Sequence, residues 1–125
     1  MHAFIIEDDY LISQAIQDVL SDLGFSRFSF ARSEDTAVLG ASEQKFDLIT
    51  ADARLLPGDG IKAVETICAR RQVPVIFITG YVDDVRERLQ GHLPQAMIIG
   101  KPIREAELSE AVRRLVPERP RSASS

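Results

Sequence analysis

The sequence predicts an α/β domain built on a doubly wound parallel sheet of five strands. Five short apolar runs alternate with five segments in which apolar residues recur at helical spacing, and the loops between them are short. Most of the runs are apolar throughout, which is typical of parallel strands that are covered on both faces. A chain of 125 residues can bury one sizeable core but not two, so we expect one domain.

The expected strands differ in pattern along the chain. They are "AFII" (3–6), "RFSFA" (27–31), "DLITA" (47–51), "PVIFI" (74–78) and "AMII" (96–99). The first, third and fourth runs are continuously apolar and are expected near the centre of the sheet. "RFSFA" alternates between apolar and polar residues, so we place it at an edge.

The first two helices are indicated by spacing and by capping residues. An amphipathic helix is expected from apolar residues at three- and four-residue steps: Leu11, Ala15, Ile16, Val19, Leu20 and Leu23. Gly24 is expected to end this helix, since glycine tolerates the left-handed backbone of a helix terminus. Ser33 is expected to cap the second helix. That helix carries Ala37 and Val38 on its inner side.

Three further helices are expected from the same spacing, with the weakest pattern in the middle one. Their apolar residues are Ile61, Val64, Ile67 and Cys68; then Val82, Val85 and Leu89; then Leu108, Ala111, Val112 and Leu115. From Pro117 the tail "PERPRSASS" loses all apolar periodicity. We therefore expect a domain of residues 1–116 and a disordered tail of residues 117–125.

Composition excludes several classes of function. The net charge is −4, with 15 basic and 19 acidic residues, which argues against a nucleic-acid-binding surface. No apolar run approaches the roughly 18 residues that a membrane helix needs. The single cysteine, Cys68, cannot form an internal disulfide, so we expect a cytoplasmic protein. His2 and His92 have no metal or nucleophile partner nearby in the sequence and are expected to be solvated.

Polar side chains follow most of the expected strands at the point where each strand ends. Glu7, Asp8 and Asp9 follow the first run and Asp52 the third. Thr79 and Gly80 follow the fourth run, and Lys101 and Pro102 the fifth. Ligands of open parallel sheets bind outside the carboxyl ends of the strands, so these groups are expected to share one site.

The chemistry of this set points to a metal and a phosphoryl group. Carboxylates from neighbouring strand ends repel one another unless a hard cation such as Mg²⁺ neutralises them. Glu7 and Asp8 are the natural metal pair, and Asp52, alone on a central strand, is the natural nucleophile for an aspartyl phosphate. A lysine ammonium and a threonine hydroxyl can then contact the phosphoryl oxygens. Taken singly, Asp52 would more often be a helix cap, Thr79 a hydroxyl satisfied by backbone and Lys101 a surface charge. For "EDD" alone, a solvated loop or cap and a functional site are about equally expected.

Together these residues closely resemble the receiver domain of two-component response regulators, over residues 3–116. The family's acidic pair matches Glu7 and Asp8, and its phosphoacceptor matches Asp52, followed by "PGDG" (57–60). Its switch hydroxyl matches Thr79, and its lysine-proline run matches "KPIREAEL" (101–108). The resemblance implies a flavodoxin-like sheet with strand order 2-1-3-4-5 and a Mg²⁺ or Mn²⁺ ion. Asp9 then serves to start the first helix.

The chain also departs from the family pattern. Pro57 lies one position farther from the phosphoacceptor than is usual, and Ile98 replaces the common switch aromatic. "FITGY" (77–81) loosely resembles the "FATGUY" motif of an alphaproteobacterial subgroup, so Tyr81 is expected to act with Thr79, Gly80 and Ile98 in switching. Arg54 would offer its backbone carbonyl to the metal, and its side chain is expected to flank the phosphoryl group and tune its hydrolysis.

The function implied is that of a stand-alone receiver. It would take a phosphoryl group from a histidine kinase or a histidine phosphotransferase onto Asp52. Its output would be protein binding, relay or a phosphate sink, as a monomer or weak dimer without DNA binding. No activity is expected beyond its own phosphorylation and dephosphorylation. A pseudo-receiver that only binds proteins remains open. An aspartyl-phosphate phosphatase is disfavoured because its nucleophile would follow the first strand.

Overall fold

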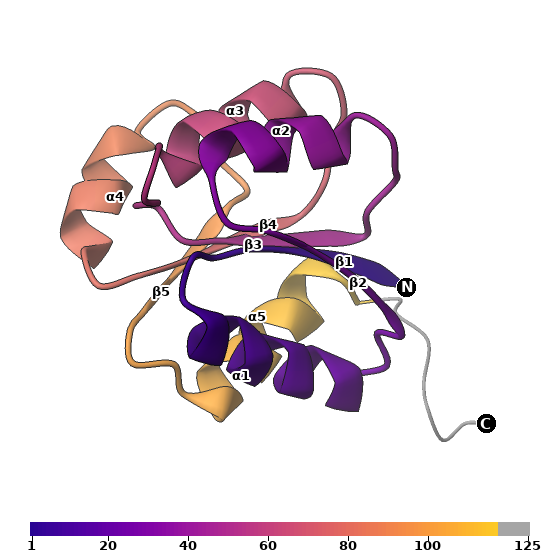
Figure 1. The fold of residues 1–125 in the computed structure, drawn as a ribbon. Helices are drawn as coiled ribbons and strands as arrows, with labels where there is room; N and C mark the ends of the chain where they lie inside the picture. Colours follow the sequence, from indigo (N-terminus) through magenta and orange to yellow (C-terminus); the bar gives the residue numbers. More distant parts are fainter. Residues whose placement is uncertain (118–125) are drawn as a thin grey trace.

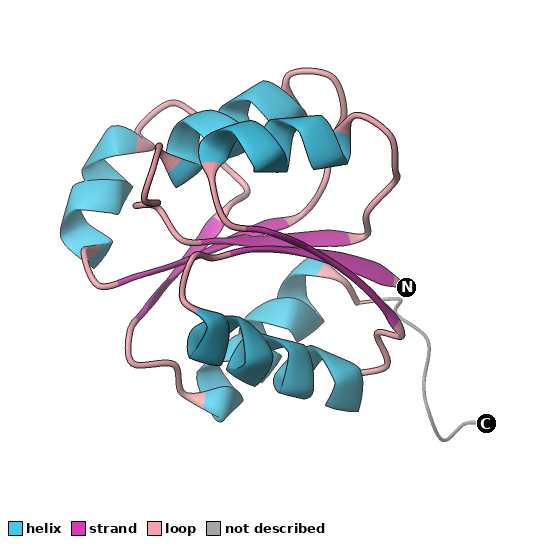
Figure 2. Ribbon diagram, in the orientation of Figure 1, coloured by secondary structure: helices cyan, strands magenta, loops and turns pink. Residues whose placement is uncertain are grey.

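The computed structural model describes residues 1–117, and most of the expected tail lies outside them. Its five parallel strands have the order β2-β1-β3-β4-β5, as the resemblance implies, with β2 at an edge (Figures 1 and 2). The strands are β1 (His2–Ile6), β2 (Arg27–Ala31), β3 (Leu48–Ala51), β4 (Val75–Thr79) and β5 (Met97–Gly100). The helices are α1 (Tyr10–Asp22), α2 (Glu34–Ala41), α3 (Gly60–Cys68), α4 (Val82–Arg88) and α5 (Glu105–Leu115).

The sheet separates two helical layers. In Figure 1, α1 and α5 cover one face, and α2, α3 and α4 cover the other. Within the sheet, Ile6 of β1 lies opposite both Ala31 of β2 and Ala51 of β3, and Thr79 of β4 lies opposite Gly100 of β5. Because all five strands are parallel, their carboxyl ends meet at one edge. That edge is where the sequence placed the polar groups.

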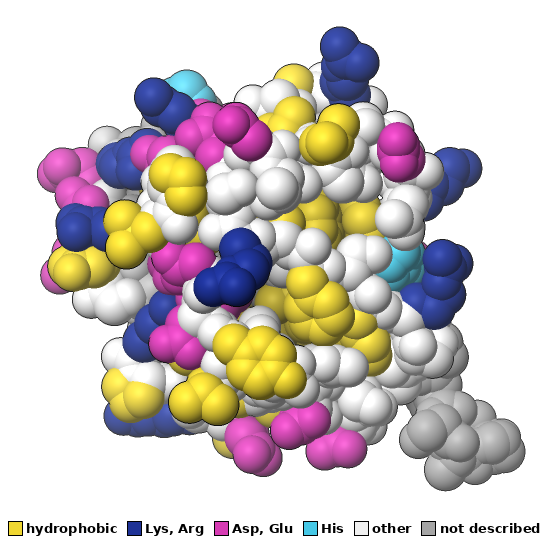
Figure 3. Space-filling view, viewed as in Figure 1, with side chains coloured by type: hydrophobic (Ala, Val, Ile, Leu, Met, Phe, Trp, Pro, Cys, Tyr) yellow, Lys and Arg dark blue, Asp and Glu magenta, His cyan; other side chains and the backbone are white. Residues whose placement is uncertain are grey.

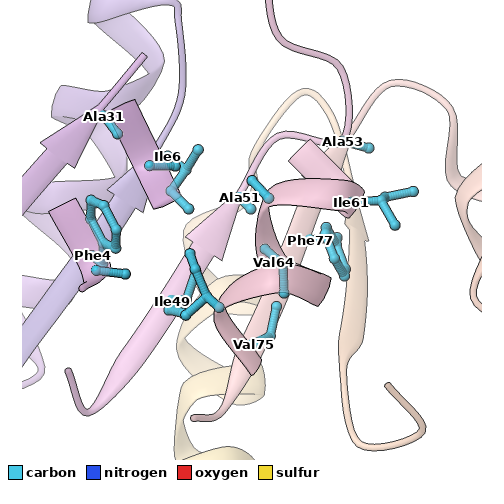
Figure 4. Close-up of a cluster of buried hydrophobic side chains, with 14 of the residues drawn as sticks. Phe4, Ile6, Ala31, Ile49, Ala51, Ala53, Ile61, Val64, Val75 and Phe77 are labelled. Carbon is cyan, nitrogen blue, oxygen red and sulfur yellow. The ribbon is translucent and has the colours of Figure 1, made fainter. Parts of the chain in front are cut away.

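Apolar side chains fill both spaces between the sheet and the helices. Along β1, Phe4 and Ile6 belong to one buried cluster, while Ala3 and Ile5 belong to the other. The first cluster includes Ile61 and Val64 of α3, as Figure 4 shows. This two-sided burial explains why the central strands have no polar alternation.

Capping residues set where α1 and α2 begin. The Asp9 carboxylate accepts hydrogen bonds from the backbone N–H groups of Leu11 and Ile12, at 2.9 and 3.2 Å. Asp9 is therefore the N-cap, as the sequence predicted. Ser33 caps α2 through a reciprocal capping box with Thr36. Gly24 follows the C-cap of α1 with φ of 104°, in the left-handed region.

The inner face of α1 was predicted wrongly in part. Leu11 is 77% exposed and Ala15 is also exposed, whereas Ser13 is buried. The Ser13 hydroxyl donates to the Tyr10 carbonyl at 2.8 Å, which makes its burial inexpensive. Ile16 and Leu20 do face the core, so the buried stripe is rotated away from the two misassigned positions.

The prediction that His2 is solvated was also wrong. His2 is buried at the start of β1, and its Nε2 lies 2.8 Å from Ser29 Oγ. Its ring lies 4.6 Å from that of Phe46, and its backbone N–H donates to Asp47. Burial and the nearby Arg27 charge lower the pKa of His2, so the neutral ring is favoured. His92 is exposed, as expected.

Thr50 carries an unused hydroxyl in the middle of the core. It is fully buried in β3 between Ile5 and Ile76, and its Oγ1 has no hydrogen-bond partner within residues 1–117. We predict that Thr50→Val raises the free energy of unfolding by about 1 kcal/mol, because it removes an unpaired buried polar group at nearly constant shape. Chemical denaturation measures the change.

Thr79→Val is the matched control for this substitution. Thr79 is equally buried, but its Oγ1 accepts a hydrogen bond from the Tyr81 N–H at 3.0 Å. The same exchange should therefore lower stability here. Equal effects at both positions would contradict the assignment of Thr50 as unsatisfied.

Candidate functional site

The sheet register brings the predicted acidic residues together. The Glu7 N–H donates to the Ala31 carbonyl and the Asp52 N–H to the Ile6 carbonyl, each at 2.9 Å. Both residues therefore extend the strand ladder by one step, so their side chains emerge at the carboxyl edge. Glu7, Asp8 and Asp52 each offer a carboxylate oxygen, and these oxygens lie within 4.8 Å of one another. This arrangement agrees with the set proposed from the sequence.

Lys101 stands between two of these carboxylates. Its Nζ donates to Asp52 Oδ2 at 2.9 Å and lies 3.2 Å from Glu7 Oε1. Burial alone would lower the pKa of Lys101, but the hydrogen bond to Asp52 and the charge of Glu7 raise it more. The ammonium therefore stays charged and offsets part of the local negative charge.

Glu7 is the most perturbed acid of the site. It is 4% exposed, and burial together with repulsion from Asp52 raises the pKa of its carboxyl group from 4.5 to about 7. The Asp9 N–H donates to Oε2 at 3.1 Å and lowers the pKa only in part. Oε1 has the ion-pair distance to Lys101 but no aligned hydrogen-bond donor among the described residues. A buried carboxylate oxygen is thus left with a vacant lone pair.

The donor set suits a hard divalent cation. Several carboxylate oxygens facing one point, one of them without a hydrogen bond, are the ligands that Mg²⁺ and Mn²⁺ prefer. Glu7, Asp8 and Asp52 would hold the ion. The backbone of Arg54 enters the same site, because its N–H donates to Asp52 Oδ1 at 3.1 Å. A metal contact of the Arg54 carbonyl remains a prediction.

The start of α3 packs directly against the backbone of Asp52. A Cβ on Gly60 would lie 1.7 Å from the carbonyl oxygen of Asp52, so only glycine permits this approach. The Gly60 N–H donates to the Ala53 carbonyl at 2.9 Å, and Asp59 caps the helix. Asp8 accepts a hydrogen bond from the Leu56 N–H at 3.0 Å. This bond connects the loop between β3 and α3 to the acidic residues.

The predicted switch residues fall into two groups. Thr79 is buried at the end of β4, and its hydroxyl oxygen accepts the Tyr81 N–H across the exposed Gly80. Ile98 lies opposite Phe77 in the sheet, away from that hydrogen bond, and packs against the first core cluster. Tyr81, rather than Ile98, is therefore the direct neighbour of the Thr79 hydroxyl.

Sequence reasoning missed the side chains that tie α4 to the loop between β3 and α3. The Arg54 guanidinium lies 3.5 Å from the centroid of the Tyr81 ring and 3.9 Å from Asp84. Arg88 of α4 forms an ion pair with Asp59 at 2.8 Å. These partners lie far apart in the sequence, and no local pattern signals them.

Comparison with known proteins agrees with this geometry. Residues 3–113 match the response regulator receiver domain. The chain belongs to this family. A curated relative, the phyllosphere-induced regulator PhyR of Methylorubrum extorquens, is 38% identical over 111 residues, which cover 86% of this chain and 40% of the relative. The chain thus spans less than half the length of that protein.

Solved structures give the same result. The receiver domain of PhyR from Erythrobacter litoralis superposes with a TM-score of 0.85 at 27% identity, covering 99% of this chain and 95% of that one. These PhyR receivers support the subgroup suggested by "FITGY". The receiver of the sensor histidine kinase PA1611 from Pseudomonas aeruginosa, with magnesium coordinated in its active-site cleft, matches with a TM-score of 0.75 at 28% identity, covering 94% and 98%. Among the described residues, no helix has the length and apolar character needed to span a bilayer.

The raised pKa of Glu7 makes the stability of the metal-free protein depend on pH. Between pH 4.5 and about 7, folded Glu7 keeps a proton that the unfolded chain has lost, so stability from this group falls as pH rises through that window. We predict that the free energy of unfolding of the wild type, measured relative to that of Glu7→Gln, decreases as the pH rises from 4.5 to about 7. Thermal melts in a chelator across this range measure it.

Mg²⁺ should restore the stability that the folded protein loses as Glu7 ionises. Because the ion binds the ionised carboxylates of the folded state, we predict that millimolar Mg²⁺ raises the melting temperature at pH 8 and has little effect at pH 5. An equal Mg²⁺ effect at both pH values, or none in the wild type at pH 8, would contradict the metal site.

Gly60 and Gly80, both near the site, should differ in how well they tolerate substitution by alanine. Gly60→Ala should lower the free energy of unfolding by at least about 1–3 kcal/mol, since the new methyl group collides with backbone at Asp52. Gly80→Ala should be tolerated, because its Cβ would meet no atom within 4 Å. Urea denaturation of both variants provides the comparison. A well-tolerated Gly60→Ala would show that α3 does not abut Asp52.

Proposed function

We propose that this receiver accepts a phosphoryl group onto Asp52 from a phosphohistidine of a histidine kinase or phosphotransferase. The observation that carries the proposal is the position of Asp52 beside Glu7 and Asp8, with the Lys101 ammonium 2.9 Å from its carboxylate. An acidic cluster alone would not suffice. The charged lysine and the buried Thr79 hydroxyl add the contacts that a phosphoryl group needs.

The proposed transfer is a single displacement at phosphorus. A carboxylate oxygen of Asp52 attacks the phosphorus atom, the P–N bond to the donor imidazole breaks, and its electron pair stays on the ring nitrogen, which takes up a proton. The product is an acyl phosphate on Asp52. A bound Mg²⁺ supplies charge neutralisation for the phosphoryl oxygens and the carboxylates. Lys101 and Thr79 hold phosphoryl oxygens, and the raised pKa of Lys101 keeps its ammonium charged.

The same site would return to its resting state by hydrolysis. Water attacks the phosphorus atom, the P–O bond to Asp52 breaks, and inorganic phosphate leaves as the carboxylate is restored. We propose that the exposed Arg54 side chain, two residues from Asp52, influences the approach of water. This turnover of its own phosphoryl group is the extent of the catalysis that we propose.

An exposed apolar surface supports a protein as the phosphoryl donor. Tyr10 and Leu11 at the start of α1 are 69% and 77% exposed, and Phe30 of β2 is 47% exposed. Figure 3 shows apolar side chains gathered beside acidic ones on this face of the molecule. Large exposed apolar groups at the carboxyl edge favour a protein contact over a nucleic acid, in keeping with the net charge of −4. We propose that its output runs through a cytoplasmic protein partner or a relay.

Radiolabelled or mass-detected phosphorylation tests the acceptor. We predict that Asp52→Asn abolishes labelling by acetyl phosphate and by a histidine kinase in Mg²⁺, because an amide is a poor nucleophile of similar shape. Asp9→Asn is the matched control, since asparagine also caps helices and Asp9 lies outside the metal set. It should be labelled like the wild type.

Two outcomes would overturn the proposal. Labelling that persists in Asp52→Asn would move the chemistry to another carboxylate, with Asp8 the next candidate. A folded wild type that binds Mg²⁺ but takes no label from either donor would support the pseudo-receiver alternative instead.

A further inference from the structure

Helix α4 is weakly anchored by apolar packing. It has seven residues, of which Val85 is the buried one, and Leu89 at its C-cap is also buried. Its N-cap, Tyr81, makes no side-chain capping bond. A short helix with so few apolar contacts depends on polar contacts for its position.

The first of these contacts holds the start of α4. The Arg54 guanidinium lies over the Tyr81 ring at 3.5 Å and near the Asp84 carboxylate at 3.9 Å. The Tyr81 N–H also donates to Thr79 Oγ1 at 3.0 Å. The Arg54 and Asp84 side chains are 59% and 56% exposed, so water and a competing anion can displace their contact.

The second contact holds the end of α4. Arg88 donates to Asp59 Oδ2 at 2.8 Å, and the Arg88 and Asp59 side chains are 39% and 27% exposed, less than those of Arg54 and Asp84. Asp59 Oδ1 accepts the N–H groups of Ile61 and Lys62, and the Asp59 N–H donates to Glu34. Asp59 is thus fixed to α2 and α3 by several bonds. This contact is the firmer of the two.

We propose that Arg54 and Tyr81 form a latch that phosphorylation of Asp52 opens, so that α4 pivots about its Arg88–Asp59 end. This inference rests on the proposed function for the opening step. A phosphoryl group on Asp52 places a dianion two residues from Arg54, and it attracts the guanidinium more strongly than an aromatic face does. It also draws in the Thr79 hydroxyl. Tyr81 then loses both its ring contact and the side-chain acceptor of its backbone N–H.

The surroundings permit this movement. No atom lies within 4 Å of a Cβ built on Gly80, so the link between Thr79 and Tyr81 has space to change conformation. The Asp59–Arg88 contact does not involve Asp52 or Thr79 and stays closed. The start of α4 is therefore released while its end is held.

Amide hydrogen exchange in the unphosphorylated protein tests the closed latch. The Val85 N–H donates to the Tyr81 carbonyl and reports on the start of α4; the Leu89 N–H donates to the Val85 carbonyl and reports on its end. Arg54→Met should speed exchange at Val85 by about two- to fivefold, the factor that an exposed cation–π contact corresponds to, and leave Leu89 unchanged. Arg86→Met removes a charge that, within residues 1–117, forms an ion pair with Asp83 of the same helix at 3.1 Å, and it should change neither amide.

A second pair of variants separates the ring contact from general disruption. Tyr81→Phe keeps an aromatic face for Arg54 and should retain slow exchange at Val85. Tyr81→Leu removes that face and should match Arg54→Met. Equal exchange at Val85 in Arg54→Met and Arg86→Met would overturn the latch, as would equal behaviour of the two Tyr81 variants.

Beryllofluoride with Mg²⁺, which mimics the phosphoryl group, tests the opening step. In the wild type, beryllofluoride should speed amide exchange at Val85 more than at Leu89. It should also change amide exchange in residues 80–91 more than in residues 97–99. In Arg54→Met, the increase at Val85 should be largely absent. A comparable increase at Leu89, or a larger response of residues 97–99, would refute the pivot. If the amide resonances of Asp52 and Thr79 do not shift, the proposed function fails, while the resting variants still decide the latch.

Discussion

Repulsion among the carboxylates of Glu7, Asp8 and Asp52 is the constraint on which the site depends. The strand ladder fixes Glu7 and Asp52 at adjacent strand ends, so the chain cannot relieve the repulsion by moving them apart. One ammonium, that of Lys101, offsets only part of the charge. A proton on Glu7 or a divalent cation must supply the rest. Burial first, and repulsion from Asp52 second, raise the pKa of Glu7, and a divalent cation at this edge would offset the same repulsion.

Apolar packing offsets this local destabilisation, but it is distributed unevenly among the strands and helices. β1, β3 and β4 are buried on both faces, so the residues at their ends are held in place. α4 receives far less apolar support and is positioned by Arg54 and Arg88. Firm placement of Asp52 and weak apolar anchoring of α4 are two consequences of how apolar residues are distributed along the chain.

The sequence predicted the sheet because its strands are short apolar runs. It predicted the residues at the carboxyl edge because polar residues directly follow most of these runs. It misplaced Leu11 and Ala15 because three- and four-residue spacing fits two neighbouring stripes of a helix, and packing against the sheet decides between them. It missed the burial of His2 because that depends on Ser29 and Phe46 from other elements. The contacts of α4 were missed for the same reason. Asp59 and Arg88 lie far apart in the sequence, and no local pattern signals their ion pair.

The position of Ile98 supports the larger switching role that we propose for Tyr81. Ile98 is β-branched, partly buried and packed in the first core cluster, so its rotation would disturb that packing without gaining a polar contact. Tyr81 is 51% exposed and already shares a hydrogen bond with Thr79 and a ring contact with Arg54. A phosphoryl group on Asp52 would, as we propose, attract both of these neighbours. A charge change at Asp52 would then reach the start of α4 through the buried Thr79 hydroxyl and the exposed Arg54 side chain rather than through Ile98.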